Sequence, residues 1–246
     1  MFRDNEGVVR AVQRAFVGLT NVPVTLAVRD GATNAARQVV LNRQAANAGR
    51  TLAFESKRID DTIGYIRFSL FVGDVVERVR SAMKELESVK TLIVDLRGNG
   101  GGIGDFAPIL AGMLSDKPGS LGESKFRYDT REFSFTPSQN AFSGKLIILV
   151  DGFSASTSEV FSGGLQNNKR ATIVGETTIG AVLPSLLTQL PTGGALQYAI
   201  SDFRLKDQTV LEGRGVIPNV AVGMNKRDVV AGRDTVLQRA IQLARR

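Results

Sequence analysis

Three short, almost wholly apolar segments constrain the fold of this chain most. They read TLIVDL at 91–96, LIILV at 146–150 and ATIVGE at 171–176, and the first two are each followed by a small-residue loop that opens a helical pattern. Strands that are apolar on both faces are typical of a parallel sheet covered by helices, because a sheet with one wet face shows alternation instead. The chain therefore predicts an α/β fold with a largely parallel sheet.

The surrounding segments agree with this fold class. TIGYIRFSLF at 62–71 predicts a further strand, and apolar residues at helical spacing predict helices over 74–89, 106–114, 157–165 and 234–245. After Pro184 the pattern turns to β. LLTQL at 186–190 and ALQYAISDF at 195–203 predict a C-terminal β-hairpin region closed by the turn PTGG.

The N-terminal part follows a different pattern. Residues 5–18 have helical spacing, and PVTLAVRD at 23–30 with ARQVVLNR at 36–43 predict a hairpin. One helix and one hairpin bury too little apolar surface to fold alone. We therefore expect residues 1–43 to be the C-terminal remnant of a small domain, residues 44–61 a linker, and residues 62–246 the main domain.

Composition excludes several kinds of function. The chain has neither His nor Cys, so it supplies no imidazole base, no thiolate nucleophile and no His or Cys metal ligand. Five of the seven excess positive charges lie in residues 1–58, but the basic residues are dispersed and Trp is absent, which argues against a nucleic-acid partner. No apolar run is long enough to predict an integral membrane segment, and the first residues show no signal-peptide pattern.

The first loop with chemical potential is DLRGNGGG, residues 95–102. Consecutive glycines expose backbone amides, and the helix that follows adds its positive dipole end, so such a loop can bind a phosphate or stabilise an oxyanion. Gly102, Gly104 and Ala107 also match the dinucleotide pattern GxGxxA, but the acidic residue expected after a second strand is missing. A tight turn without a ligand is the alternative.

The second loop, residues 150–166, places Ser154, Ser156 and Ser158 at the start of a predicted helix. Ser156 and Glu159 have the spacing of a capping box, which is a purely structural interpretation. The nucleophile-elbow pattern GxSxG is absent. A serine at a helix N-terminus beside a glycine-rich loop nevertheless has an oxyanion site next to it, and it lacks only a base.

Together the motifs resemble those of the C-terminal processing (tail-specific) serine peptidases. They read LIVDLRGNGGG, VDGFSASTSEVFSGGLQNN, RATIVGETTIG and EGRGVIPN, in which Asn219 stands where the family has Asp. The resemblance implies a crotonase-like core preceded by a PDZ domain, of which residues 1–43 resemble the last third. It also implies a polypeptide substrate, no cofactor and a location outside the cytoplasm, and it leaves the oligomeric state open.

Residue by residue, the resemblance implies that Ser156 is the nucleophile. The backbone amides of Thr157, Gly101 and Gly102 would stabilise the oxyanion. The family's lysine base falls on Ala181, in GETTIGAVL, and Asn167 occupies the position of a carboxylate that orients this lysine. Glu159 and Glu176 are then the carboxylates left as candidate catalytic bases, and Lys169 is a displaced lysine that could take the same role.

Two functions remain after this comparison of motifs. The first is a serine peptidase that uses an unidentified base, and it is the one favoured here because both loops are intact. The second is a catalytically silent relative that binds a peptide or an apolar ligand in the same cleft. The segment GETTIGAVLPS also resembles the interphotoreceptor retinoid-binding proteins, a branch with members that lack the lysine.

Overall fold

A computed structural model describes residues 21–30, 33–42 and 52–246, which fall into two units. In the first unit β1 (Pro23–Arg29) pairs antiparallel with β2 (Ala36–Asn42), so the predicted hairpin is confirmed. The same unit includes residues 225–233 with the short helix α5 (Lys226–Val230). The helix predicted over 5–18 and residues 44–51 of the predicted linker lie outside the described residues.

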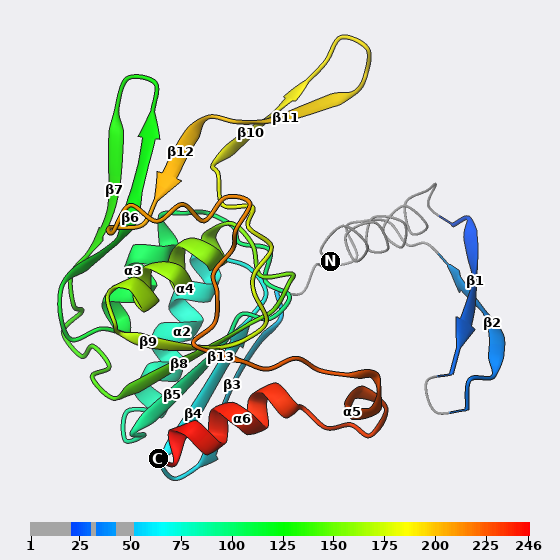
Figure 1. Cartoon of the computed structure of the whole chain (residues 1–246), viewed down its shortest axis with the longest axis horizontal. Coiled ribbons are helices and arrows are strands. Elements are labelled where there is room, and N and C mark those ends of the chain that lie inside the picture. Colours follow the sequence, from blue (N-terminus) through cyan, green and yellow to red (C-terminus); the bar gives the residue numbers. More distant parts are fainter. Residues whose placement is uncertain (1–20, 31–32, 43–51) are drawn as a thin grey trace. The chain divides into compact units, whose positions relative to one another are not determined.

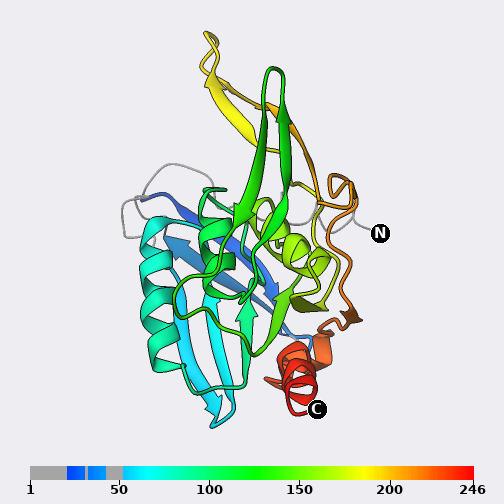
Figure 2. The same cartoon turned by 90° about the vertical axis from the view of Figure 1, so that its left-hand side faces the viewer.

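The second unit is built on a six-stranded sheet (Figures 1 and 2). Its order is β13-β9-β8-β5-β4-β3, and all neighbours are parallel except β3 and β4. The largely parallel sheet predicted from the apolar runs is therefore confirmed. The strands are β3 (Phe54–Asp60), β4 (Ile63–Phe68), β5 (Thr91–Asp95), β8 (Lys145–Val150), β9 (Ala171–Gly175) and β13 (Val220–Ala221).

The linker predicted over 44–61 is wrong for residues 54–60. This segment, FESKRID, forms β3 and pairs antiparallel with β4, with Phe54 opposite Phe68. As the edge strand it carries mostly charged and polar side chains, which is how edge strands avoid pairing with other chains. Because most of its residues are polar, β3 contains no apolar run, and the sequence pattern did not predict it as a strand.

Helices cover both faces of the sheet, which explains why the central strands are apolar throughout. Alternate residues of β5 point to opposite faces, so Leu92 and Val94 join one core cluster and Ile93 joins the other. The larger cluster packs α2 (Gly73–Glu85), α3 (Phe106–Met113) and α4 (Thr157–Asn167), and the smaller one packs α6 (Thr235–Ala244).

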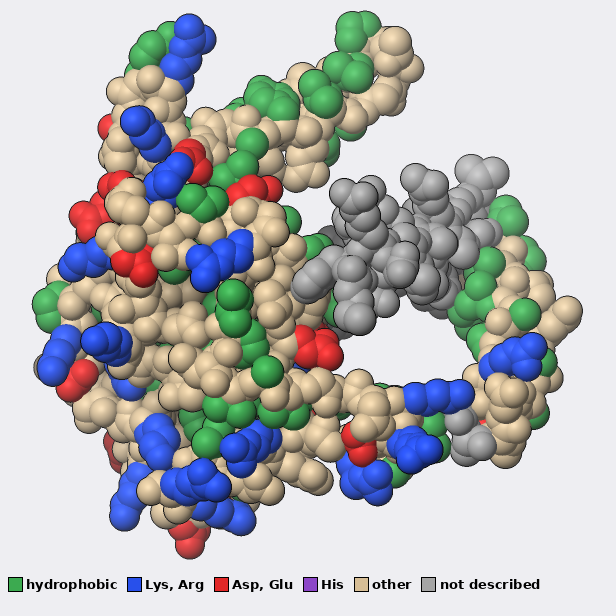
Figure 3. Space-filling model, viewed as in Figure 1, with side chains coloured by type: hydrophobic (Ala, Val, Ile, Leu, Met, Phe, Trp, Pro, Cys, Tyr) green, Lys and Arg blue, Asp and Glu red, His purple; other side chains and the backbone are tan. Residues whose placement is uncertain are grey.

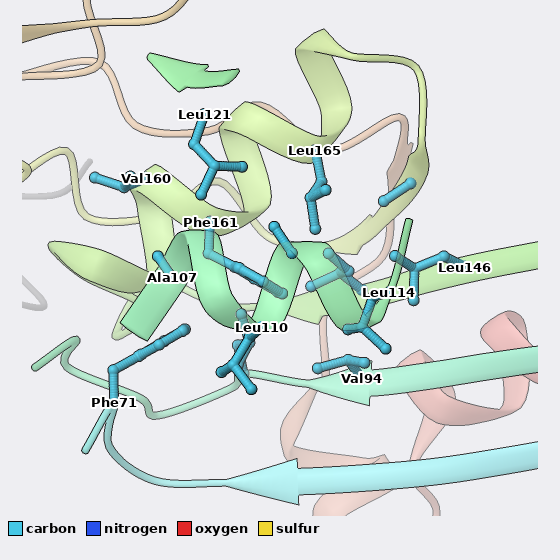
Figure 4. Packing of buried hydrophobic residues seen from close by; sticks show 14 of the residues in the cluster. Phe71, Val94, Ala107, Leu110, Leu114, Leu121, Leu146, Val160, Phe161 and Leu165 are labelled. Carbon is cyan, nitrogen blue, oxygen red and sulfur yellow. The ribbon is translucent and has the colours of Figure 1, made fainter. Parts of the chain in front are cut away.

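Phe71 connects this core to the loops above it. Its ring is fully buried and packs edge-to-face on Phe161 of α4, with 5.6 Å between ring centroids (Figure 4). Its backbone pairs with the glycine-rich loop: the Phe71 amide donates to the Gly101 carbonyl at 2.8 Å and the Phe71 carbonyl accepts from the Ile103 amide at 2.9 Å. The position of that loop therefore depends directly on core packing.

Two β-structures project from this body in Figure 1. One is a three-stranded sheet of β6 (Gly119–Phe126), β7 (Thr130–Phe135) and β12 (Ser201–Arg204), and the other is the hairpin of β10 (Ser185–Gln189) and β11 (Ala195–Ala199). The predicted hairpin is confirmed over 186–199, but its second strand does not extend to 203. Residues 201–204 pair with β6 instead, because β6 and β7 supply an edge that sequence analysis did not predict.

An ion-pair network attaches α6 to the carboxyl end of the sheet. Asp95, at the end of β5, is fully buried and accepts from Arg97 through both oxygens, at 2.9 and 2.6 Å. The same guanidinium donates to both oxygens of Asp234, at 2.8 and 2.7 Å. Asp234 also caps α6 by accepting from the Leu237 amide at 2.9 Å. The Arg97–Asp234 pair therefore joins the C-terminal helix α6 to the glycine-rich loop.

Asp234→Ala is expected to lower the free energy of unfolding by about 2–4 kcal/mol, because it removes a helix cap and leaves Arg97 with one of its two carboxylates. Asp202→Ala is the matched control, since its pair with Arg204 is exposed and is worth at most about 1 kcal/mol. Urea unfolding at neutral pH measures both. Equal losses in the two variants would show that the network does not anchor α6.

Candidate active site

The two loops singled out in the sequence meet at the carboxyl edge of the sheet, where β5 and β8 are adjacent and parallel. Three hydroxyl groups at the start of α4 hold them together, each by donating to a backbone carbonyl of the glycine-rich loop. The pairs are Ser154 to Leu96 at 2.8 Å, Thr157 to Gly102 at 2.9 Å and Ser158 to Asn99 at 2.9 Å. The serine-rich sequence therefore binds one loop to the other rather than only capping a helix.

Two further polar side chains, which sequence analysis missed, order these loops. The carboxylate of Asp151 accepts from the amides of Gly98 and Ser154, one in each loop, both at 3.0 Å. Asn99 donates to the Phe68 carbonyl at 2.9 Å and accepts from the Gly101 amide at 2.9 Å. Asp151 directly follows a buried strand, and that position was the available signal for its role.

Ser156 has a backbone conformation that side chains rarely adopt, with φ 53° and ψ −119°. Such strain costs about 1–3 kcal/mol and occurs preferentially at functional sites. It occurs here on a sharp turn from strand to helix, which is the geometry of a nucleophile elbow although the GxSxG glycines are absent. The Ser156 side chain is half-buried at the start of α4.

The glycine-rich loop approaches Ser156 closely. A Cβ atom placed on Gly101 would lie 2.8 Å from Ser156 Cβ and 2.9 Å from the Thr157 amide nitrogen. The Gly101 carbonyl accepts from Phe71, and all peptide bonds described are trans, so the Gly102 amide on the same peptide unit points away from Phe71. The predicted proximity of the serine to the glycine-rich loop is therefore present in the structure.

Of the three amides predicted to stabilise an oxyanion, Gly101 is wrong as a donor. Its N–H already donates to the Asn99 side chain. The amides of Gly102 and Thr157 donate to no other group in the part of the chain that the structure describes. Gly101 instead allows the close approach, since its φ of +100° and the small space beside Ser156 both require glycine.

Glu159 is fully buried and lies one turn into α4, where its carboxylate accepts four hydrogen bonds. Oε2 accepts from the amides of Ser156 and Ala181, both at 3.0 Å, and Oε1 accepts from Thr178 Oγ1 at 2.6 Å and the Gly180 amide at 2.7 Å. Burial raises the pKa of Glu159 above its ordinary value of 4.5, although these four hydrogen bonds oppose the rise. With both oxygens occupied, Glu159 connects the nucleophile loop to the segment that contains Ala181.

The raised pKa of Glu159 predicts a pH effect on stability. A folded state that binds the Glu159 proton more tightly than the unfolded state gains stability below the unfolded pKa, and this gain disappears as pH rises through the folded pKa. Glu159→Gln cannot titrate. The difference in free energy of unfolding, wild type minus Glu159→Gln, is therefore expected to fall as pH rises from 4.5 toward neutrality. Thermal unfolding across this range measures it, and a difference that grows with pH contradicts the assignment.

Ala181 is adjacent to Ser156, because its backbone carbonyl accepts from the Ser156 amide at 3.0 Å. The side chain of Ala181 is exposed. The position that the motif assigns to the lysine base is thus next to the serine and is occupied by a methyl group. No Lys, Arg, Asp or Glu side chain in the described residues forms a hydrogen bond with the Ser156 hydroxyl.

Glu176 lies elsewhere, at the end of β9, where its exposed carboxylate is placed against Gly223 beyond β13. Asn167 ends α4, about 16.5 Å of helix away from Ser156, so the role of orienting a base at position 181 is wrong for it. Neither residue is brought to the serine. Glu176 therefore has no contact with a described residue that supports a catalytic role.

The described residues contain no group of three or more Asp and Glu side chains that could hold a metal ion. In this part of the chain no helix combines the length and the apolar character needed to cross a membrane.

Comparisons with known proteins agree with this geometry. Residues 62–222 match the model of peptidase family S41. A carboxyl-terminal-processing protease of Synechocystis is 29% identical over 233 residues, covering 92% of this chain and 54% of the relative. A carboxy-terminal-processing protease of Bartonella bacilliformis is 27% identical over 192 residues, covering 73% and 43%. The chain thus spans about half the length of these relatives.

A solved structure shares the fold. The photosystem II D1 C-terminal processing protease superimposes with a TM-score of 0.66 at 25% identity, over 84% of this chain and 57% of that chain. These relatives are named as processing proteases, and neither they nor the family match shows the lysine-lacking branch that GETTIGAVLPS resembles.

Proposed function

Because the chain belongs to peptidase family S41, we propose that it cleaves peptide bonds of extended polypeptides through an acyl-enzyme on Ser156. The observation that carries this proposal is the approach of the glycine-rich loop to Ser156. It places beside a strained serine two amides, those of Gly102 and Thr157, that donate to no other described residue. The relatives named as carboxyl-terminal-processing proteases support a substrate that is cut near its C-terminus.

In this mechanism the Ser156 oxygen attacks the carbonyl carbon of the scissile bond, and the carbonyl oxygen becomes an oxyanion. The amides of Gly102 and Thr157 donate to that oxyanion, which is worth about 3–4 kcal/mol for one well-placed donor. Collapse breaks the C–N bond, the leaving amine takes a proton from solvent, and an ester remains on Ser156. Water then hydrolyses this ester, which releases a carboxylic acid and restores the Ser156 hydroxyl. Glu159 acts as a positioning residue, since its carboxylate holds the Ser156 amide and the segment 178–181 in place.

Among the described residues the Ser156 proton has no side-chain acceptor, and in the mechanism proposed for them solvent takes it. A serine hydroxyl without a base is a weak nucleophile, and we expect acylation to be slow. The crotonase-like topology, the PDZ-like character of residues 1–43 and a location outside the cytoplasm are further proposals, supported only by the family resemblance.

A fluorophosphonate probe tests the proposal. Wild type is expected to bind the probe covalently, and Ser156→Ala is expected to lose the label entirely. Ser185→Ala, which removes an exposed serine at the start of β10, is the control and keeps the label. Intact-mass measurement over time reports the rate. No labelling of wild type, or equal labelling of Ser156→Ala, would overturn the proposal and favour a cleft that only binds.

A further inference from the structure

The hairpin β10–β11 has one apolar face that nothing covers in the described part of the chain. Leu186 pairs with Tyr198 and Thr188 with Leu196, so these four side chains share a face, and Leu190 continues the alternation. Leu186 and Leu196 are each 50% exposed and Tyr198 is 43% exposed. The hairpin projects from the body in Figure 1, and its hydrophobic side chains are visible along it in Figure 3.

The opposite face of the same hairpin has fewer large apolar side chains. Ser185 and Gln197 lie on it and are hydrogen-bonded at 2.8 Å, and Leu187 is its one large apolar residue among those described, 68% exposed. A two-stranded hairpin is marginally stable without a second layer. Keeping one face apolar and uncovered therefore points to a ligand that supplies the missing layer.

The hairpin is joined directly to the catalytic segment. β10 begins at Ser185, which is within about 13 Å of Ala181 along the chain. The carboxylate of Glu212 holds the connection by accepting from the amides of Val182 and Leu183, at 2.8 and 3.2 Å. A polypeptide whose scissile bond lies at Ser156 therefore has the hairpin within reach of its neighbouring residues.

The chemistry of the hairpin restricts its partner. No charged residue occurs between Glu176 and Asp202, in a chain that is 22% charged, so this segment offers no ion pair to an acidic or basic ligand. The four large apolar side chains of this face, Leu186, Leu190, Leu196 and Tyr198, are each half-exposed and together amount to a few hundred Å². A stable dimer buries about 800 Å² on each partner. The face is thus small for a second copy of the chain and suitable for one extended segment.

We infer that the apolar face formed by Leu186, Leu190, Leu196 and Tyr198 is a docking surface for an uncharged, apolar stretch of the unfolded polypeptide substrate. This inference rests on the proposed function and adds a second contact to it, outside the loops that hold the reacting bond. The surface selects chains that expose alternating apolar residues, as unfolded proteins do, and raises their local concentration at Ser156.

Binding tests this surface independently of hydrolysis. In the Ser156→Ala background, fluorescence anisotropy measures the Kd of a labelled peptide of about twelve residues with leucine and serine alternating, ended by lysines for solubility. The double variant Leu186→Gln with Tyr198→Gln is expected to raise this Kd about 10-fold, because it removes at least one apolar contact that the bound peptide would bury. Leu187→Gln is the matched control, on the other face of the same strand, and is expected to stay within about 2-fold.

Equal affinities in the double variant and in Leu187→Gln would overturn the inference. So would sedimentation velocity that shows a dimer of the full chain which the double variant loses, because the face would then be occupied by a second copy. A probe that labels Ser156 while the peptide fails to bind refutes the docking surface alone. Peptide binding without labelling refutes only the peptidase.

Discussion

Ala181→Lys is expected to raise the rate of peptide hydrolysis by about 10²–10⁴-fold, the range that a positioned general base contributes. Residue 181 is hydrogen-bonded through its carbonyl to the Ser156 amide, so a side chain at this position starts beside the nucleophile. The wild-type methyl group cannot take a proton. A lysine amine within reach of the Ser156 hydroxyl supplies the step that the described residues lack.

The same variant has a predicted pH dependence. The side chain at position 181 is exposed, so an amine introduced there keeps a pKa near its ordinary value of about 10.4. Only the neutral amine acts as a base. The rate of Ala181→Lys is therefore expected to rise with pH up to about 10 and to level off above it.

Hydrolysis of an unfolded, fluorescently labelled polypeptide between pH 6 and about 10.5 checks both expectations. Ala181→Met is the matched control, because it adds a side chain of similar length without an amine. Ala181→Lys combined with Ser156→Ala must be inactive. Equal rates for Ala181→Lys and Ala181→Met would show that position 181 is not aimed at the serine.

Gly101→Ala is expected to reduce acylation of Ser156 by about 10²–10³-fold, the effect of losing one oxyanion donor. The new methyl group would lie 2.8 Å from Ser156 Cβ and 2.9 Å from the Ala155 carbonyl oxygen and the Thr157 amide nitrogen. Two of these three atoms belong to the backbone and cannot rotate away. The loops must therefore separate, which moves the Gly102 amide away from the oxyanion.

Strain adds to this effect, because φ at Gly101 is +100°, and we expect Gly101→Ala to lose about 1–3 kcal/mol of stability. Gly100→Ala is the matched control. Gly100 lies in the same loop, has an ordinary φ, and has no atom within 4 Å of the methyl group that alanine would add. Gly100→Ala is therefore expected to react with the probe at nearly the wild-type rate and to unfold at nearly the wild-type temperature. Labelling rates and thermal unfolding separate the two variants. A Gly101→Ala protein that labels as fast as Gly100→Ala would refute the assignment of this loop as the oxyanion site.

Much of the fold was predictable because its signals are local. TLIVD and KLIILV became β5 and β8 as predicted, since apolar character on both faces follows from helices above and below the sheet. The resemblance to C-terminal processing peptidases is likewise confirmed by the family match over residues 62–222. β3, β6 and β7 were missed or misassigned, because these strands are rich in charged and polar residues and exist only by pairing with a partner.

The site was predictable in part. Ser156 and Thr157 were correctly placed next to the glycine-rich loop, because both loops follow parallel strands whose carboxyl ends share one edge. The structure did not bring Glu176 to the serine, and it occupied both oxygens of Glu159 with backbone and threonine donors. The presence of a carboxylate in a motif does not indicate which neighbouring groups will donate hydrogen bonds to it in the fold.

The sequence alone determined the parallel α/β architecture, the peptidase family and the absence of lysine at position 181, since each depends only on residue type and order. Tertiary structure alone decided that Gly101 donates its amide to Asn99, that Ser156 adopts an elbow without the elbow motif, and that Leu186 and Tyr198 are half-exposed. The physical reason is that hydrogen-bond partners and exposed area are properties of contacts between distant segments. Residue types restrict those contacts, and only the folded arrangement selects among them.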